Sequence, residues 1–209
     1  MTQPYAAEAL SAPSAQASAS SGSIVLVRHG RPALSRKVKL DWRGYRTWWA
    51  AYGESGLALG EVPPKKLVTI AALADLIVAS PLARARETAE RLAPGAEILI
   101  DEIFVEAPLP APQIPIVHLR PGTWNVLSRL FWLMGYSAAG ESHQHADIRA
   151  AEAAGRIEGL ARGRKLVLLC AHGWFNRMIR GVLRARGWRC VYDGGDSYWA
   201  WRRFEPPAI

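Results

Sequence analysis

Cysteine is scarce in this chain, and no hydrophobic run is long. Only Cys170 and Cys190 occur among the 209 residues. Two isolated cysteines do not make a disulfide framework, so we expect a reducing, cytoplasmic setting. No stretch reaches the roughly 20 apolar residues that cross a bilayer. The nearest one, residues 124–136, is short and is interrupted by Arg129. We therefore expect no membrane span, and we interpret this segment as a partly buried helix.

Lysine and arginine are absent from residues 1–22, which are rich in alanine and serine. This segment also has no continuous apolar core, so it lacks the charged and hydrophobic regions of a secretory signal. We expect it to be a disordered tail. Residues 23–209 have the length of one catalytic domain, and the 50% hydrophobic content of the chain suits a sizeable core.

Acidic residues are fewer than basic ones. The chain has 18 Asp and Glu against 26 Lys and Arg, which gives a formal charge of +8 and a pI near 9.9. An excess of positive charge favours anionic partners, such as phosphate esters, nucleic acid or membrane lipid. The charge alone does not choose among these partners.

Three short apolar runs are the clearest structural signal, and each ends in polar residues or glycine. They cover residues 24–27, 76–79 and 166–171. Their hydrophobicity is continuous rather than alternating, which is typical of strands that are buried on both faces of a parallel sheet.

Helical spacing of apolar residues follows two of these runs. After the second run, Ser80 is expected to cap a helix and Pro81 to begin it, and another helix is expected from Gly173 onward. Further predicted elements are a strand at 96–100, a helix at 141–162 and an edge strand at 197–204. This order predicts an α/β fold, a three-layer sandwich with a mainly parallel central sheet.

Histidine and arginine lie at the ends of the predicted strands. Arg28 and His29 follow the first run, Ser80 the second and His172 the third, with Arg84 early in the next helix. The carboxyl ends of parallel strands border the binding crevice of an α/β sheet. Two imidazoles among guanidinium groups repel one another when charged, unless an anion lies between them. A phosphoryl group is the natural anion for such a site.

Four segments resemble the histidine phosphatase superfamily, which has the phosphoglycerate mutase-like fold. They are LVRHG (26–30), SPLARARETA (80–89), DEIFVE (101–106) and AHG (171–173), in the order seen in that family. The resemblance extends from about residue 24 to residue 204, and the segments 31–66 and 102–121 look like insertions.

The resemblance implies a role for each matching residue. His29 would be the nucleophile that accepts the phosphoryl group as phosphohistidine. Arg28, Arg84 and His172 would form the phosphate pocket, with His172 also catalytic, and Glu106 would be the acid that protonates the leaving alcohol. The same resemblance implies a reaction without metal or cofactor.

Elementary chemistry agrees with these roles. A neutral imidazole attacks phosphorus only through a free nitrogen, so His29 needs a partner for its other nitrogen, and a backbone carbonyl is expected. Arginine forks spread the charge of the phosphoryl oxygens by bidentate hydrogen bonds. A carboxylic acid is needed because an alkoxide is too basic to leave without a proton.

The sequence departs from the family at two places. Ser35 stands where many members have asparagine, and we expect it to donate one hydrogen bond to the phosphate. The glycine and tryptophan that typically follow the acid are missing after Glu106, which leaves Glu102 as the alternative acid. These departures favour simple hydrolysis over a mutase reaction.

Several other residues are secondary candidates. Trp42, Trp48 and Trp49, in the basic segment 41–49, are candidate substrate contacts. Arg31 and Glu141 are expected near the rim of the pocket or, for Glu141, at a capped helix start. His143 and His145 are interpreted as solvated rather than metal-binding.

The residues together predict a metal-independent phosphomonoesterase that acts on a small phosphate ester through His29. One alternative is a phosphomutase of the same fold. Another is a non-catalytic binding protein that uses the surface of segment 41–49, although nucleic acid is not expected as a partner because such a binder has no use for two pocket histidines.

Overall fold

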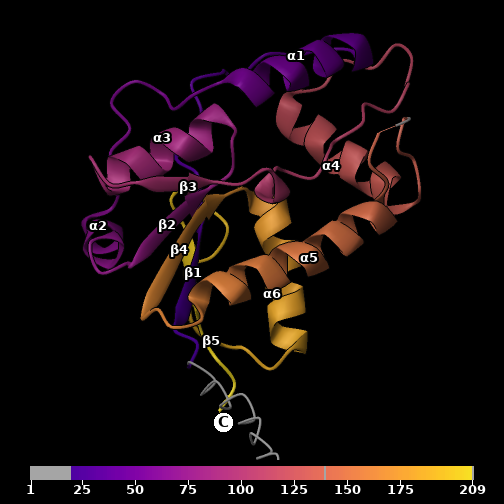
Figure 1. Cartoon of the computed structure of the whole chain (residues 1–209). Helices are drawn as coiled ribbons and strands as arrows, with labels where there is room; N and C mark the ends of the chain where they lie inside the picture. The colour runs from indigo at the N-terminus through magenta and orange to yellow at the C-terminus, as the bar shows by residue number, and fades with distance from the viewer. Residues whose placement is uncertain (1–19, 139, 209) are drawn as a thin grey trace, which may run out of the picture.

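The computed structural model describes residues 20–138 and 140–208, so most of the predicted tail lies outside the described residues. Within them the chain forms a six-stranded sheet in the order β3-β2-β4-β1-β6-β5 (Figure 1). The strands are β1 (Ser23–Arg28), β2 (Leu76–Ala79), β3 (Ile98–Ile100), β4 (Leu166–Ala171), β5 (Arg189–Asp193) and β6 (Trp201–Glu205). The pairs among β1, β2, β3 and β4 are parallel, whereas β6 runs antiparallel to both β1 and β5. The predicted, mainly parallel sheet is confirmed.

Helices cover both faces of this sheet. The helices α2 (Lys65–Ala71) and α3 (Ala83–Leu92) lie on one face, and α5 (His143–Ala161) and α6 (Gly173–Ala185) lie on the other (Figure 1). Successive residues of a strand point to opposite faces. Accordingly Val25 and Val27 pack with α2 and α3, while Ile24 and Leu26 pack with α5 and α6. Both faces of β1 and β4 are therefore covered, which explains the continuous apolar runs at residues 24–27 and 166–171.

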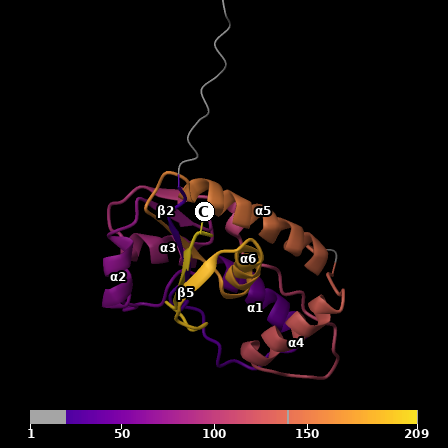
Figure 2. The ribbon, with the colours of Figure 1, turned by 90° about the horizontal axis from the view of Figure 1, so that it is seen from below.

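A third core lies at one end of the molecule, where α1 (Trp42–Glu54) is close to α4 (Pro121–Leu133) (Figures 1 and 2). Its buried members include Tyr45, Trp48, Tyr52 and Trp124. The rings of Tyr45 and Trp124 are stacked with centroids 5.5 Å apart. Aromatic residues of α1 thus order much of the predicted insertion at 31–66 by packing against α4. Helix α4 begins where the other predicted insertion, 102–121, ends.

Two of the predicted boundaries are wrong. Helix α3 begins at Ala83 with Leu82 as its N-cap, so Ser80 and Pro81 precede it. The Ser80 hydroxyl lies 2.8 Å from Nε2 of His172 and accepts only a long hydrogen bond (3.5 Å) from the Leu82 N–H. The predicted edge strand at 197–204 begins only at Trp201. Trp199 has a φ of 62°, a left-handed conformation that cannot continue an extended strand.

The position of β6 also differs from the prediction. It lies inside the sheet between β1 and β5, and the edge is formed by β5, which the sequence analysis did not predict. Most residues of β5 are exposed, so it lacks the apolar pattern that identifies a buried strand.

Residues 20–138 and 140–208 contain no helix with the length and apolar character needed to traverse a bilayer. Both cysteines are free, Cys170 buried in β4 and Cys190 on β5.

Candidate active site

His29 lies directly after β1 and is only 2% exposed. Its backbone N–H donates to the Ala171 carbonyl at the end of β4 (3.0 Å), which fixes the histidine between two strand ends. Its Nδ1 lies 2.7 Å from the carbonyl oxygen of Gly30. A carbonyl only accepts, so Nδ1 carries the proton and Nε2 keeps its lone pair. This is the arrangement that a nucleophilic imidazole needs.

The surroundings keep His29 neutral. Burial lowers the pKa of His29 well below 6.5, and the positive charges of Arg84, Arg28 and Arg36 lower it further, against the raising effect of the Gly30 carbonyl. A neutral imidazole is nucleophilic, whereas an imidazolium is not. The positive charges of the arginines therefore favour an anion at this place and also keep His29 unprotonated.

His172 follows β4 and is fully buried. Its ring centroid is 5.3 Å from that of His29, and its Nε2 lies 2.8 Å from the hydroxyl of Ser80, which follows β2. Burial, followed by the charge of Arg84, lowers the pKa of His172 well below 6.5. Three neighbouring strand ends thus bring Ser80, His172 and His29 into contact.

Two arginines flank the histidines. Arg84, at the start of α3, is 1% exposed and donates through Nη1 to the carbonyls of Tyr52 (2.8 Å) and Gly53 (3.1 Å) at the end of α1. Arg28 packs its guanidinium 4.6 Å from the Tyr198 ring and donates through Nη1 to the Asp196 carbonyl. Within the described part of the chain, the Nε atoms of both arginines are buried without a hydrogen-bond partner. These donors suit an anion with several oxygens.

Glu106 is a loop residue whose carboxylate lies against the N-terminus of α6. Its Oε1 accepts from the Phe175 N–H (2.9 Å) and its Oε2 from the Trp174 N–H (3.3 Å). The first N–H groups of a helix have no partner within the helix, so a carboxylate stabilises them. Glu106 also lines the same cavity as His29.

The alternative acid, Glu102, has a different place. It lies in the short 3-10 helix η1 (Glu102–Phe104), is exposed, and does not line the cavity.

Behind the loop that carries Glu106, Arg149 donates through Nη1 to the carbonyls of Ile103 (2.9 Å) and Val105 (2.8 Å). Glu141 pairs with this arginine at 2.7 Å, so it supports the loop and does not line the cavity.

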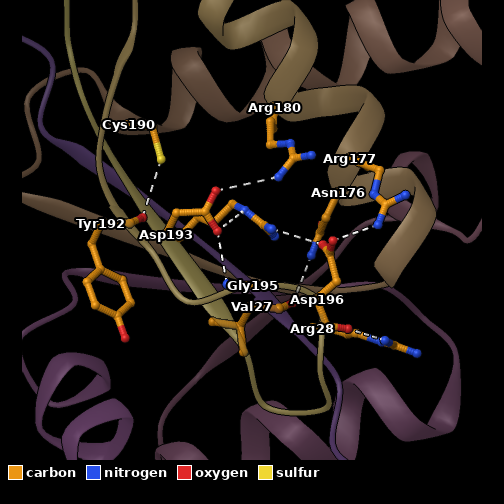
Figure 3. Close-up of polar contacts among 11 residues, drawn as sticks. Val27, Arg28, Asn176, Arg177, Arg180, Cys190, Tyr192, Asp193, Gly195 and Asp196 are labelled. Carbon is orange, nitrogen blue, oxygen red and sulfur yellow. Dashed lines mark hydrogen bonds and ion pairs between the residues drawn. The ribbon is translucent and has the colours of Figure 1, made fainter.

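A loop between β5 and β6 closes one side of the site and is fastened by charged pairs (Figure 3). Arg202 contacts Asp193 (2.8 Å) and Asp196 (3.0 Å), and Arg177 of α6 contacts Asp196 (2.6 Å). The loop brings the Tyr198 ring to 5.7 Å from the His29 ring. The sequence analysis missed these residues, because nothing in their spacing links them to the strand ends.

Ser35 does not meet the other predicted residues. It is exposed, its hydroxyl accepts from the Lys37 N–H (3.3 Å), and it does not line the cavity. Its neighbour Arg36 lines the cavity and donates through Nη1 to the Tyr198 hydroxyl (3.0 Å). The expected serine contact with phosphate finds no support, since the chain turns its arginine inward instead. Arg31 pairs with Glu61 at 3.0 Å and is likewise outside the cavity lining.

The candidates of segment 41–49 divide. Trp49 lines the cavity, whereas Trp48 is buried and donates from Nε1 to the Ser35 carbonyl (3.0 Å). The Arg43 guanidinium lies over the Trp42 ring, 4.4 Å from the ring centroid.

His143 lies against the Trp132 ring and 3.5 Å from Asp147. No group of three or more His, Cys, Asp or Glu residues is arranged to hold a metal ion in the described ranges.

A cavity of about 400 Å³ extends from His29 toward α4. The side chains that line it come from the strand ends, from α1, α4 and α6, and from two loops. They are Arg28, His29, Arg36, Trp49, Tyr52, Glu106, Leu109, Asn125, Val126, Arg129, Leu130, Leu133, Gly173, Trp174, Arg177 and Asp196.

A comparison with family models places the chain in a known superfamily. The model of the histidine phosphatase superfamily (branch 1) matches residues 65–189, a span that contains Arg84, Glu106 and His172. The chain belongs to this superfamily. None of the curated proteins matches the sequence.

Solved structures share the fold at low identity. The chain is similar to mycobacterial hydrolase 1, with 20% identity over 88% of this chain and 89% of that chain, at a TM-score of 0.56. It is similar to a phosphoserine phosphatase from Entamoeba histolytica, with 18% identity over 78% and 80% of the two chains (TM-score 0.53). It is also similar to a phosphoglycerate mutase from Bacillus anthracis, with 15% identity over 81% and 83% (TM-score 0.53). The predicted phosphoglycerate mutase-like fold is confirmed.

Proposed function

We propose that the protein is a metal-independent phosphomonoesterase that hydrolyses a small phosphate ester through phosphohistidine on His29. The observation that carries the proposal is the buried His29 ring, with Nδ1 held by the Gly30 carbonyl at 2.7 Å and guanidinium groups around it. Membership of the superfamily and the phosphatase among the similar structures support it.

In the first step, Nε2 of His29 attacks phosphorus and the ester P–O bond breaks. The leaving oxygen takes a proton from Glu106, which lines the cavity beside His29. Arg28, Arg84 and His172 stabilise the charge on the transferred oxygens. The Arg36 guanidinium adds a further positive charge. A neutral His172 donates from Nδ1 when the Ser80 hydroxyl donates to its Nε2, which lies 2.8 Å away.

In the second step, Glu106 as carboxylate takes a proton from water while the oxygen attacks phosphorus. The N–P bond breaks, inorganic phosphate leaves, and both His29 and Glu106 return to their first states. The same group thus acts as acid and then as base. The charge is carried by arginine and histidine, so the reaction needs no metal.

The test combines a variant with direct detection of the intermediate. His29→Ala should lose at least about four powers of ten in turnover of 4-nitrophenyl phosphate, the usual result of removing a nucleophile. Wild-type protein that is mixed with ³²P-labelled substrate and quenched during turnover should carry an acid-labile label that the variant lacks. EDTA should change neither result. Normal turnover by His29→Ala would overturn the mechanism.

The same labelling, repeated with a ³²P-labelled phosphate ester whose alcohol carries a second hydroxyl, separates the two alternatives. A phosphomutase passes the label to a second hydroxyl of the substrate, whereas a phosphatase releases it as inorganic phosphate. A non-catalytic binding protein incorporates no label. His29, Glu106, Arg28 and Arg36 line one cavity, which supports catalysis over binding alone. We propose hydrolysis over phosphoryl transfer to a second hydroxyl because the sequence departs from the family pattern after the acid.

A further inference from the structure

The cavity beyond His29 has an apolar wall that phosphate chemistry does not require. Helix α4 contributes Val126, Leu130 and Leu133 to the lining. Their spacing of four and three residues places them on one face of the helix. Their exposed fractions are 60%, 51% and 42%, so this face contacts the cavity and solvent rather than the core.

Other elements complete this wall. Trp49 comes from α1, Leu109 from the loop between η1 and α4, and Trp174 from α6, and all three line the cavity. Trp174 is held in place because the Arg129 guanidinium lies 4.5 Å and the Arg177 guanidinium 5.4 Å from its ring centroid. Aromatic and aliphatic groups therefore surround the space in which a leaving group would lie.

Most polar groups of the lining bind one another. Arg177 pairs with Asp196 at 2.6 Å. The amide of Asn125, oriented to satisfy both of its ends, accepts from Arg36 Nη2 and donates to Tyr45 and Pro121. These groups do not need a polar ligand to satisfy them.

Four donors of the lining are left over in the described ranges: Nε of Arg28 and of Arg36, Nε1 of Trp174 and Nη1 of Arg129, all buried without a partner. Of these residues, Arg129 is 8% exposed. Burial lowers the pKa of Arg129 to about 10, against the raising effect of Glu106. The Trp132 and Trp174 rings, each with its centroid 4.5 Å from the guanidinium, cover the two sides of this group.

From this wall we infer that the substrate is a phosphate monoester with an apolar leaving group, an alkyl or aryl body that packs against α4. The inference rests on the proposed function, because it assigns the phosphate to His29 and the leaving group to the rest of the cavity. Burial of a methylene group contributes about fourfold in binding. Affinity should therefore rise with chain length until the cavity of about 400 Å³ is filled.

Alkyl phosphonates test the inference without any hydrolysis, because their P–C bond is not cleaved. We expect the Kd measured by calorimetry to fall by about 16-fold from methyl to propyl phosphonate, and by about as much again to pentyl phosphonate. 5-Phosphonopentanoate, which has the same length as the pentyl ligand but ends in a carboxylate, should bind more weakly. Equal affinity along the series, or tighter binding of the carboxylate ligand, would overturn the inference.

A pair of variants locates the effect on α4. Leu130→Asn should lose about tenfold in affinity for pentyl phosphonate and keep its affinity for methyl phosphonate. Leu73→Asn is the matched control, since Leu73 is 69% exposed and does not line the cavity. An equal loss for both ligands in Leu130→Asn, with its melting temperature unchanged, would contradict the assignment.

The two proposals fail in different ways. Chain-length dependence without any ester hydrolysis would overturn the proposed function and leave the apolar site in place. Hydrolysis of all esters at the same kcat/KM, together with flat phosphonate affinities, would leave the phosphatase and remove the apolar leaving group.

Discussion

The two ends of the active-site cavity are built in opposite ways. At the phosphate end, His29 lines the cavity, whereas Arg84 and His172 are buried behind the lining. All three are at most 2% exposed and are held by strand ends or by carbonyls of α1. At the other end, Val126, Leu130 and Leu133 lie on one helix outside the sheet and remain about half exposed. Under the proposed function this difference is a division of roles, in which the buried end carries out the reaction and the exposed end selects the ester. Each of the following changes tests one side of that division.

Among the changes that leave the nucleophile in place, Arg84→Gln has the largest expected effect. Glutamine keeps one donor for the Tyr52 and Gly53 carbonyls but removes the charge, and loss of one such stabilising group costs on the order of 100-fold to 1,000-fold in kcat. The loss should be the same for methyl and pentyl phosphate, because Arg84 acts on the shared phosphoryl group. Steady-state kinetics on both esters measures it.

Arg86→Gln is the control for this variant. Arg86 is two residues further along α3 and exposed, so its kinetics should not change. A loss in Arg84→Gln that depended on chain length would break the division between the two ends.

Glu106→Gln tests the junction between the two ends. The glutamine carbonyl can accept from only one of the Trp174 and Phe175 N–H groups, which bind different oxygens of Glu106, and the amide cannot donate an acidic proton. We expect turnover of an alkyl phosphate to fall about 100-fold. Turnover of 4-nitrophenyl phosphate should fall much less, because nitrophenolate leaves without a proton.

Glu102→Gln provides the comparison, since Glu102 is exposed on η1 and does not line the cavity. Its kinetics should match the wild type on both esters. A selective loss on alkyl esters in Glu102→Gln, with none in Glu106→Gln, would reverse the assignment of the acid.

The buried histidines also predict how stability depends on pH. In the folded protein the pKa values of His29 and His172 are lowered well below 6.5, the value of the unfolded chain. Below pH 6.5 the unfolded state therefore binds protons that the folded state does not, so stability falls as the pH falls. Each histidine contributes a loss of up to about 1.4 kcal/mol per pH unit.

Urea denaturation between pH 7 and pH 5.5 measures this slope. His29→Asn should flatten it by up to about half of the histidine contribution, even where the variant is less stable overall. Inorganic phosphate should flatten it in the wild type, because an anion between the rings favours their protonation. An unchanged slope in the variant would contradict the view that burial keeps His29 neutral.

The buried end was far more accessible to prediction than the exposed end. Continuous apolar runs identified β1, β2 and β4, and residues that directly follow such strands must meet at one edge of the sheet, so His29, Ser80 and His172 could be grouped from the sequence. Arg84 was found because a family motif contains it. Local order along the chain carried this information.

The remainder depended on tertiary packing. Ser35 and Arg36 are adjacent, and only the packing of α1 against α4 decides which of them faces the cavity. The apolar face of α4 has helical spacing that is equally typical of a helix packed in a core, so the sequence did not identify it as a cavity wall. Tyr198 reaches His29 through the left-handed turn at Trp199, which no strand pattern indicates.

Tyr198→Phe gives the smallest effect and decides to which end Arg36 belongs. The ring stays beside His29, but the Arg36 Nη1 loses its acceptor at 3.0 Å. Because the charge of Arg36 lowers the pKa of His29, we place Arg36 at the phosphate end. The KM should therefore rise about threefold to tenfold, the usual cost of one hydrogen bond, and equally for methyl and pentyl phosphate. Tyr192→Phe, whose ring stacks on Trp201 at 3.8 Å, should change neither value. A rise confined to pentyl phosphate would move Arg36 to the leaving-group end, where it would help to select the ester.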